Sequence, residues 1–155
     1  MNISHEVLHM RLEEEINLTR NMISPARDSL YMCPSIEWVK DFAKDLAAMD
    51  HPTYAYEKWD CDDFAFWASL QASNARAESS IADSGHTVLI AYVTLNKSVL
   101  GINVEGALEH ACLLILTSDA DWVLLEPQTG VIKNAKQVLY DDDTRPTCVV
   151  TYVIM

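Results

Sequence analysis

The sequence predicts a single α+β domain in which N-terminal helices and a central, cysteine-bearing helix pack on an antiparallel sheet. Apolar residues recur at helical spacing in the first half, whereas β-branched apolar runs dominate the second half. Helices followed by strands favour α+β over alternating βαβ units. The length of 155 residues suits one core. We expect one domain over 1–155, with a helical part (1–58), a central part (59–130) and a C-terminal strand region (131–155).

Two segments before residue 50 predict helices. Apolar positions in Ser4–Met22 follow roughly helical spacing. Ser35 is a favourable N-cap for a second helix that runs to about Met49, with one apolar stripe along it.

A central helix is predicted to begin at Asp60, which is a favourable N-cap. Acidic residues in its first turn suit the positive end of the helix dipole. The helix is expected to end within residues 74–84. One face is made of small and apolar residues at helical spacing, which indicates a well-buried helix: Cys61, Phe64, Ala65, Ala68 and Ala72.

Four apolar, β-branched runs after residue 85 predict strands. They are His86–Leu95, Ala107–Thr117, Trp122–Glu126 and Thr147–Met155. Ser118–Asp121 has the composition of a hairpin turn that joins the second run to the third.

The charge of the chain restricts its partners. Lys and Arg number 11 against 23 Asp and Glu, a formal net charge of −12. Nucleic acids and anionic membranes repel such a polyanion, so neither is expected to bind. No apolar run reaches the ~20 residues needed to span a bilayer. The N-terminus lacks the layout of a secretion signal, so we expect a cytoplasmic location.

The cysteines do not form a recognisable metal or disulfide pattern. Cys33, Cys61, Cys112 and Cys148 contain no CxxC pair, which argues against a cysteine-rich zinc site. In a chain without a secretion signal, reduced and buried thiols are the default expectation. Cys61 is the candidate exception.

Three residues could together form a nucleophilic thiol site. Cys61 directly follows the predicted N-cap, where the helix dipole favours a thiolate. His110 lies near the start of one strand and Glu126 ends the next. If Ser118–Asp121 is a hairpin turn, His110 and Glu126 are cross-strand neighbours, about 5 Å apart. A nearby histidine that takes the thiol proton, oriented by a carboxylate, is what such chemistry requires.

Each of these residues also has a purely structural interpretation. Cysteine is among the most frequently buried residues, so Cys61 could simply belong to the core. His110 could be a hydrogen-bonded core histidine, and Glu126 could only end a strand. His86 is the alternative histidine, but no acidic residue lies at a matching distance on a neighbouring strand.

Three segments resemble a known family. WDCDDFAFW (59–67), EHACLLIL (109–116) and WVLLEPQTG (122–130) are similar in order and residue type to papain-like cysteine peptidases, and to their bacterial and phage transglutaminase-like branch. The resemblance implies a papain-like fold, with Cys61 as nucleophile, His110 as general base and acid, and Glu126 as the orienting group. It further implies a cysteine hydrolase, either peptidase/amidase or transglutaminase-like, that acts on a peptide or protein through an acyl-enzyme. No cofactor or metal is implied, and a phage-encoded chain would work in the host cytoplasm.

The segment departs from that family at the group that stabilises the oxyanion. No glutamine precedes Cys61 at the usual place, which leaves backbone N–H groups, Tyr56 or Trp59 as donors. Tyr56, Trp59 and Gln128 are the candidate substrate-binding residues.

Two other functions remain open at the level of sequence. The aspartates around the thiol (Asp60, Asp62 and Asp63) oppose thiolate formation. Together with the missing glutamine, they favour an inactive papain-like binding module that holds a small ligand or a host protein. A third, weaker interpretation is a mononuclear metal site formed by His110, Glu126 and one of these aspartates.

Overall fold

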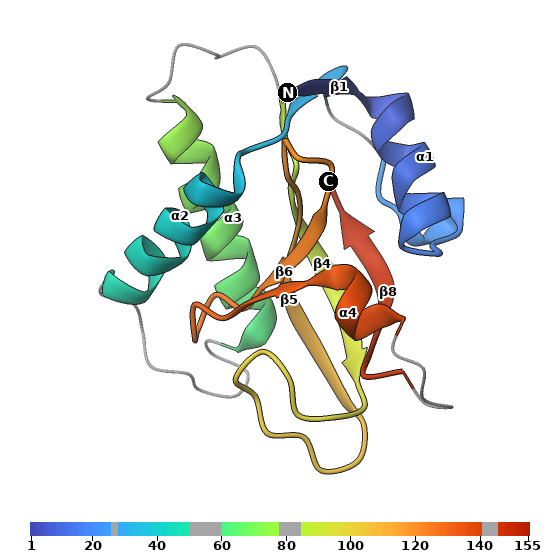
Figure 1. The fold of residues 1–155 in the computed structure, drawn as a ribbon, viewed down its shortest axis with the longest axis vertical. Coiled ribbons are helices and arrows are strands. Elements are labelled where there is room, and N and C mark those ends of the chain that lie inside the picture. Colours follow the sequence, from blue (N-terminus) through green and yellow to red (C-terminus); the bar gives the residue numbers. More distant parts are fainter. Residues whose placement is uncertain (26–27, 50–59, 78–84, 141–145) are drawn as a thin grey trace.

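The computed structural model describes residues 1–25, 28–49, 60–77, 85–140 and 146–155. Its centre is a five-stranded antiparallel sheet with strand order β7-β6-β5-β4-β8 (Figure 1). The strands are β4 (Val88–Leu95), β5 (Leu108–Leu116), β6 (Trp122–Leu125), β7 (Ile132–Asn134) and β8 (Cys148–Ile154).

Helices cover both faces of this sheet. On one face lie α2 (Ile36–Ala48) and α3 (Cys61–Ala77), and on the other lie α1 (His5–Glu15) and α4 (Ala135–Leu139) (Figure 1). Successive residues of a strand point to opposite faces. In β5, Leu113 therefore packs toward α2 and α3, whereas Leu114 packs toward α1.

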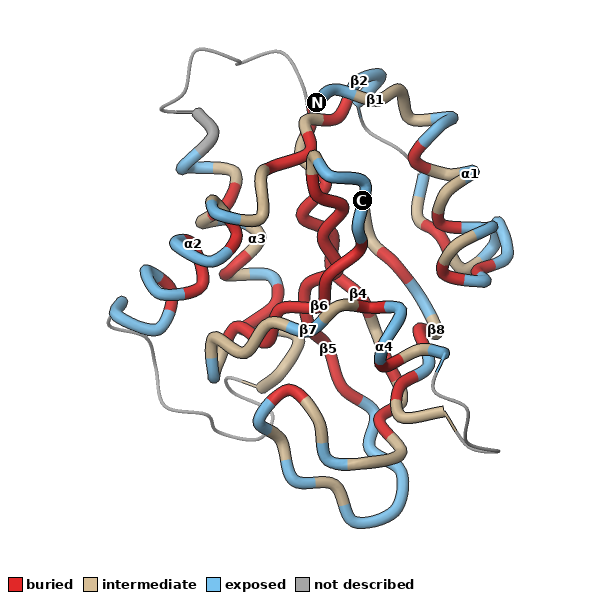
Figure 2. Tube along the Cα trace, viewed as in Figure 1, coloured by how far each residue is buried: buried red, intermediate tan, exposed pale blue. Residues whose placement is uncertain are grey.

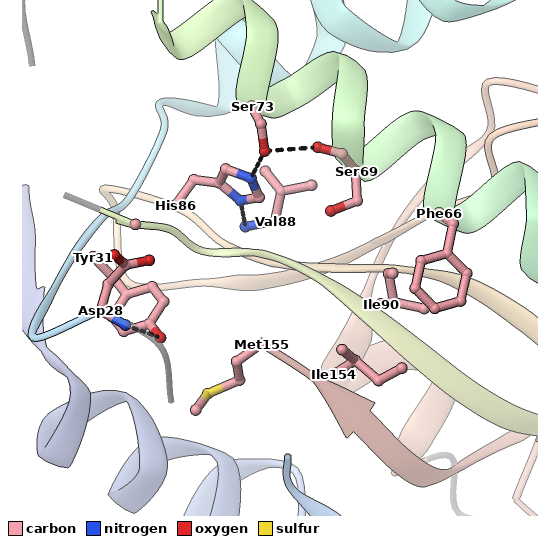
Figure 3. A pocket seen from close by; sticks show the side chains of 11 residues that line it. Asp28, Tyr31, Phe66, Ser69, Ser73, His86, Val88, Ile90, Ile154 and Met155 are labelled. Carbon is pink, nitrogen blue, oxygen red and sulfur yellow. Dashed lines mark hydrogen bonds between the residues drawn. The ribbon is translucent and has the colours of Figure 1, made fainter. Parts of the chain in front are cut away.

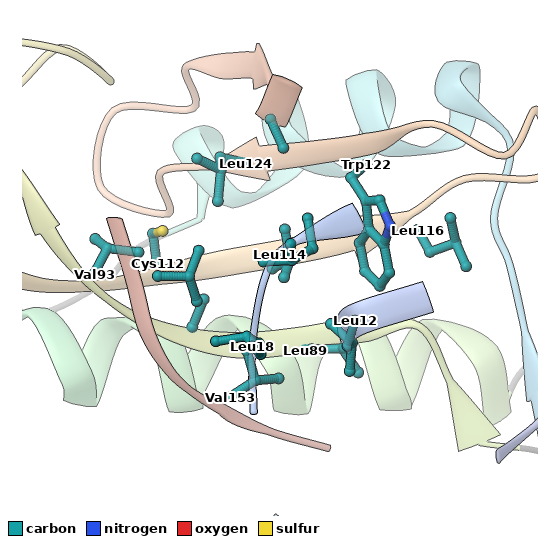
Figure 4. Packing of buried hydrophobic residues seen from close by; sticks show 14 of the residues in the cluster. Leu12, Leu18, Leu89, Val93, Cys112, Leu114, Leu116, Trp122, Leu124 and Val153 are labelled. Atoms are coloured by element: carbon teal, nitrogen blue, oxygen red, sulfur yellow. The ribbon is translucent and has the colours of Figure 1, made fainter. Parts of the chain in front are cut away.

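Burial on both faces explains the continuous apolar character of the central strands. β6 is buried at all four of its residues, and β5 from its third residue onward (Figure 2). On the α1 side, Figure 4 shows Leu12, Leu89, Leu114 and Trp122 in one cluster. Such runs are typical of strands without a solvent-facing side.

A second sheet was not anticipated from the sequence. It has three short strands, β1 (Asn2–Ser4), β2 (Leu30–Met32) and β3 (Gly85–His86), and β2 pairs with β3 in parallel. Pairs of two or three residues carry no periodic signal, because alternation needs about four residues to be visible.

The N-terminal helix is shorter than predicted. The expected helix over Ser4–Met22 ends at Glu15, and a 3-10 turn follows at Arg20–Met22. Asn17 adopts a positive φ of 60°, a left-handed conformation that asparagine tolerates and that stops a helix. Ser35 caps α2 as predicted, since its Oγ accepts a hydrogen bond from the Trp38 N–H at 3.1 Å.

The central helix α3 begins at Cys61, as predicted. The carbonyl of Asp60 accepts the Phe64 N–H at 3.1 Å, and the Asp60 N–H donates to Asp63 Oδ2 at 3.3 Å. Together these two bonds fix the first turn of α3. Cys61 itself is half-buried. The other four residues of the expected face are buried: Phe64, Ala65, Ala68 and Ala72.

No described helix is both long and apolar enough to cross a membrane. The expected cytoplasmic location, the absence of nucleic-acid binding and the division of the chain at residues 58 and 130 stay predictions.

Candidate functional site

The structure brings Cys61, His110 and Glu126 together at one end of the central sheet. Cys61 opens α3, His110 is the third residue of β5, and Glu126 directly follows β6. The His110 Nε2 atom lies 2.5 Å from Glu126 Oε2, and Cys61 is near enough to His110 to raise the pKa of its imidazole. Three groups distant in sequence therefore meet around one imidazole.

The register differs from the one expected for His110 and Glu126. The β5–β6 ladder pairs Leu113 with Leu125 and Leu116 with Trp122. Continuing this register places Glu126 opposite Cys112, so His110 is a diagonal neighbour and not a directly opposite one. Diagonal neighbours are ~7–8 Å apart at the backbone, a distance that two long side chains can bridge.

A tight turn holds the Glu126 carboxylate, which is fully buried. Its Oε1 accepts the Gln128 N–H at 3.0 Å, while Oε2 faces His110. The Gly130 N–H donates to the Glu126 carbonyl at 2.8 Å, and the Glu126 N–H donates to the Val131 carbonyl at 3.0 Å. Both carboxylate oxygens thus have described partners, as a buried charge requires.

The surroundings of His110 stabilise its protonated form. Burial acts to lower the pKa of His110, but hydrogen bonds with Cys61 and Glu126, together with their charges, outweigh it and raise this pKa to about 9. An imidazolium between a thiol and a carboxylate is the arrangement that stabilises a thiolate.

The other three thiols are sealed in the core. Burial raises the pKa of Cys148 to about 12 and also raises the pKa of Cys112 and of Cys33. Cys61 differs because it is half-buried and lines a cleft of about 230 Å³. The expectation that most cysteines are buried and Cys61 is the exception is confirmed.

Sequence reasoning missed part of this cleft. Besides Cys61, His110 and Gln128, its wall includes Ile102, Leu108 and Glu109. Leu108 and Glu109 could have been found as the residues that precede His110 on its strand, but Ile102 lies in a loop without any pattern. The proposed substrate contacts Tyr56 and Trp59 lie outside the described residues.

The neighbouring acidic residues at the start of α3 oppose the ionisation of Asp62. A hydrogen bond with Asp60, then burial and the Asp60 charge, raise the pKa of Asp62. Burial raises the pKa of Tyr92, and the charges of Asp62, Cys61 and Asp60 raise it further.

Neither the metal site expected from His110, Glu126 and an aspartate nor the alternative histidine, His86, belongs to this cleft as the structure describes it. Within the described part of the chain, the side chains close enough to share one metal ion are three aspartates, without His110 or Glu126: Asp60, Asp62 and Asp63. His86 bonds to Ser73 at 2.7 Å and lines a different pocket.

This chain resembles known proteins at the level of three-dimensional structure and not of sequence. No protein-family model matches the chain, and no curated protein sequence matches it. Two solved structures each have a TM-score of 0.67 to this chain and cover 99% of it. One, 16% identical, is described as a complex of PSL1a with E64; the other, 17% identical, is the lectin of Polyporus squamosus bound to the epitope Neu5Acα2-6Galβ1-4GlcNAc. This chain spans about half the length of either.

These likenesses correct the assignment made from sequence. Neither description names a papain-like or transglutaminase-like peptidase, and one names a lectin. The expected superfamily, its papain-like fold, the cysteine hydrolase activity and the peptide or protein substrate are therefore wrong by this comparison. The physical reason is that a Cys–His–acid arrangement is local and recurs on unrelated folds, so it identifies neither fold nor reaction. At such low identity the likeness shows the fold alone: the chain shares the fold of half of each neighbour.

Proposed function

We propose that this chain is a binding module that holds a glycan in the cleft beside Cys61. The observation that carries the proposal is the match of nearly the whole chain to a lectin described with a bound trisaccharide. The matched region is about half of that lectin. Glycan binding therefore has to be tested on this chain itself, at the cleft beside Cys61.

The chemistry of the cleft suits a sugar ring. Glu109, His110 and Gln128 supply polar groups, and Ile102 and Leu108 supply apolar surface. A pyranose presents hydroxyl groups at its edge and C–H bonds on its faces, and binding sites match such ligands with a few polar groups on an apolar lining. The volume of about 230 Å³ is on the scale of one sugar unit.

Saturation-transfer NMR with the trisaccharide Neu5Acα2-6Galβ1-4GlcNAc and its three monosaccharides tests this proposal. We expect saturable binding that Gln128→Ala weakens and that Gln137→Ala leaves unchanged, because Gln137 is exposed on α4, away from the cleft lining. Absence of saturable binding, or equal binding by both variants, would contradict it.

We also propose that the cleft carries a reactive thiol, with Cys61 as nucleophile, His110 as the base that takes its proton and Glu126 as the group that orients the imidazole. The bond between His110 and Glu126, and the position of Cys61 beside His110 in the same cleft, support this role. Epoxides are electrophiles that a thiolate can open. In the proposed step, the sulfur bonds to an epoxide carbon, the carbon–oxygen bond breaks, and the proton from His110 goes to the released oxygen.

Mass-spectrometric mapping after treatment with E64 and, separately, iodoacetamide tests the thiol. We expect modification at Cys61 before Cys33, Cys112 or Cys148, because burial raises the pKa of those three. His110→Ala should slow the reaction of Cys61, whereas His5→Ala should not. Equal modification of all four thiols, or no effect of His110→Ala, would overturn the role.

The two experiments give independent answers. If the chain binds the glycan and Cys61 is unreactive, the chain is a binding module alone. If Cys61 is reactive and no glycan binds, the glycan proposal is wrong and the thiol proposal stands.

A further inference from the structure

A second pocket lies between α3, β3 and the end of β8, and we call it the α3–β3 pocket. It has a volume of about 270 Å³, somewhat more than the cleft beside Cys61, and the two share no lining residue in the described ranges. Figure 3 shows its principal side chains, of which the argument uses Asp28, Tyr31, Phe66, Ser69, Ser73 and His86.

Hydrogen bonds fix the polar wall of this pocket. The Nδ1 atom of His86 accepts the Val88 N–H at 3.2 Å, so in neutral His86 the proton resides on Nε2. That Nε2–H then donates to Ser73 Oγ at 2.7 Å, and the Ser73 hydroxyl donates to the Ser69 carbonyl at 3.1 Å (Figure 3). In this tautomer His86 is a donor to Ser73, so the pair positions a wall and does not activate a nucleophile.

The positions of Asp28 and Tyr31 at one end of the pocket require a glycine at position 85. A Cβ atom at Gly85 would lie 2.7 Å from Asp28 Oδ2 and 2.8 Å from ring carbons of Tyr31. Such distances are shorter than van der Waals contact, so only glycine lets Asp28 and Tyr31 take these positions. The Asp28 N–H also points to the Tyr31 hydroxyl, at 3.5 Å.

The opposite side of the pocket is apolar and aromatic. Val88, Ile90 and Ile154 line it, together with Phe66, whose side chain remains 47% exposed on α3. Figure 3 shows the Phe66 ring beside Ile90 and facing the space between α3 and the end of β8. An exposed ring at the edge of a pocket offers a face for a ligand and adds little to the core.

Asp28 is the charged side chain that lines this pocket. Among its described lining residues Asp28 is the only acid, and none is a lysine or an arginine. In the described part of the chain, no ion pair or hydrogen bond engages the Asp28 carboxylate. The whole chain carries a net charge of −12, which also attracts cations.

We propose that the α3–β3 pocket binds a small organic cation, an ammonium group attached to an apolar body. The ammonium group pairs with the Asp28 carboxylate at one end of the pocket, and the Phe66 ring closes the other end (Figure 3). The apolar body occupies the space along Val88, Ile90 and Ile154. This site is separate from the glycan cleft and does not depend on the function proposed for it.

Three probes of nearly equal size and different charge test the proposal: benzylammonium, benzyl alcohol and benzoate. Chemical-shift mapping by NMR should show saturable binding of benzylammonium at the α3–β3 pocket, with weaker binding of benzyl alcohol and none of benzoate. Equal binding of the cation and the alcohol, or no binding of the cation, would overturn the proposal.

Variants separate the charge from the shape of the pocket. Asp28→Asn should weaken benzylammonium binding about tenfold, since a charge-assisted hydrogen bond is lost. Asp45→Asn removes the same charge from an exposed position on α2 and should leave binding unchanged. Phe66→Ala should also weaken binding, and because Phe66 is exposed this variant should fold. Binding unaffected by both Asp28→Asn and Phe66→Ala would contradict the site.

Discussion

The imidazole of His110 meets the carboxylate of Glu126 at 2.5 Å, although the two residues are not opposite each other in the β5–β6 ladder. The strand β6 ends at Leu125, and the turn that follows directs the Glu126 side chain back across β5. The contact therefore depends on the turn as much as on the strands.

The substitution Glu126→Gln should lower the pKa of His110. Glutamine retains the size of the side chain, but it removes the charge that stabilises the imidazolium. We expect the pKa to fall from about 9 by at least about one unit, measured by NMR titration of the imidazole. Glu109→Gln is the matched control, since Glu109 bonds to Thr94 at 2.7 Å and is exposed. Equal shifts in both variants would show that the effect is not specific to the Glu126 contact.

The stability of the fold should decrease as the pH rises above neutrality. The pKa of His110 is about 9 in the folded chain, against about 6.5 when unfolded, so its contribution is complete below pH 6.5 and is lost as the pH rises through 9. Between pH 6.5 and 8.5 the free energy of unfolding should fall by on the order of 2 kcal/mol. Urea denaturation at several pH values measures it, and His110→Gln should flatten the dependence. The same slope in both proteins would assign the loss to other groups.

A methyl group at Gly130 should disturb the turn that holds Glu126. Gly130 has a φ of +68°, and a Cβ there would lie 3.2 Å from the Ala43 carbonyl oxygen. Gly130→Ala should cost about 1–3 kcal/mol of stability, from the left-handed conformation and the contact together. Gly106→Ala is the control, because it has a positive φ of 94° but nothing within 4 Å. Thermal unfolding should show the larger loss for Gly130→Ala; a reversed order would exclude the contact with Ala43 as the cause.

Truncation of the core on the α1 side should be costly. Leu114 is fully buried in the cluster of Figure 4, so Leu114→Ala should reduce the free energy of unfolding by about 2–5 kcal/mol. Leu70→Ala removes the same atoms from a side chain that is 58% exposed and should change stability by less than about 0.5 kcal/mol. Chemical denaturation compares the two, and similar losses would mean that Leu114 is less tightly packed than the structure indicates.

Several local features could be read from the sequence because neighbouring residues determine them. Ser35 caps α2 through a bond three residues along, and α3 begins at Cys61 behind Asp60. The end of α1 was missed because one asparagine, Asn17, stopped a pattern that otherwise continued. The short strand β3 was missed because two residues have no periodicity.

The site was predicted in part. Cys61, His110 and Glu126 converge, but by a diagonal contact whose geometry depends on where β6 ends. Ile102 enters the cleft from a loop, and a loop position is fixed by the contacts it makes after folding. The likeness to a lectin also could not be inferred from the motif, because three residues in a cleft do not specify the rest of a fold.

By itself, the sequence determined the helix α2, the start of α3 and the long apolar strands β4, β5 and β8, and that one of four thiols stands at a helix start, since these depend on near neighbours and on hydrophobic periodicity. Only the tertiary structure decided that both faces of the central sheet are covered, which side chains enclose each pocket and how an acid reaches a histidine from a diagonal position. Such properties arise from contacts between residues far apart in the chain, and their geometry follows from the packing of all layers at once.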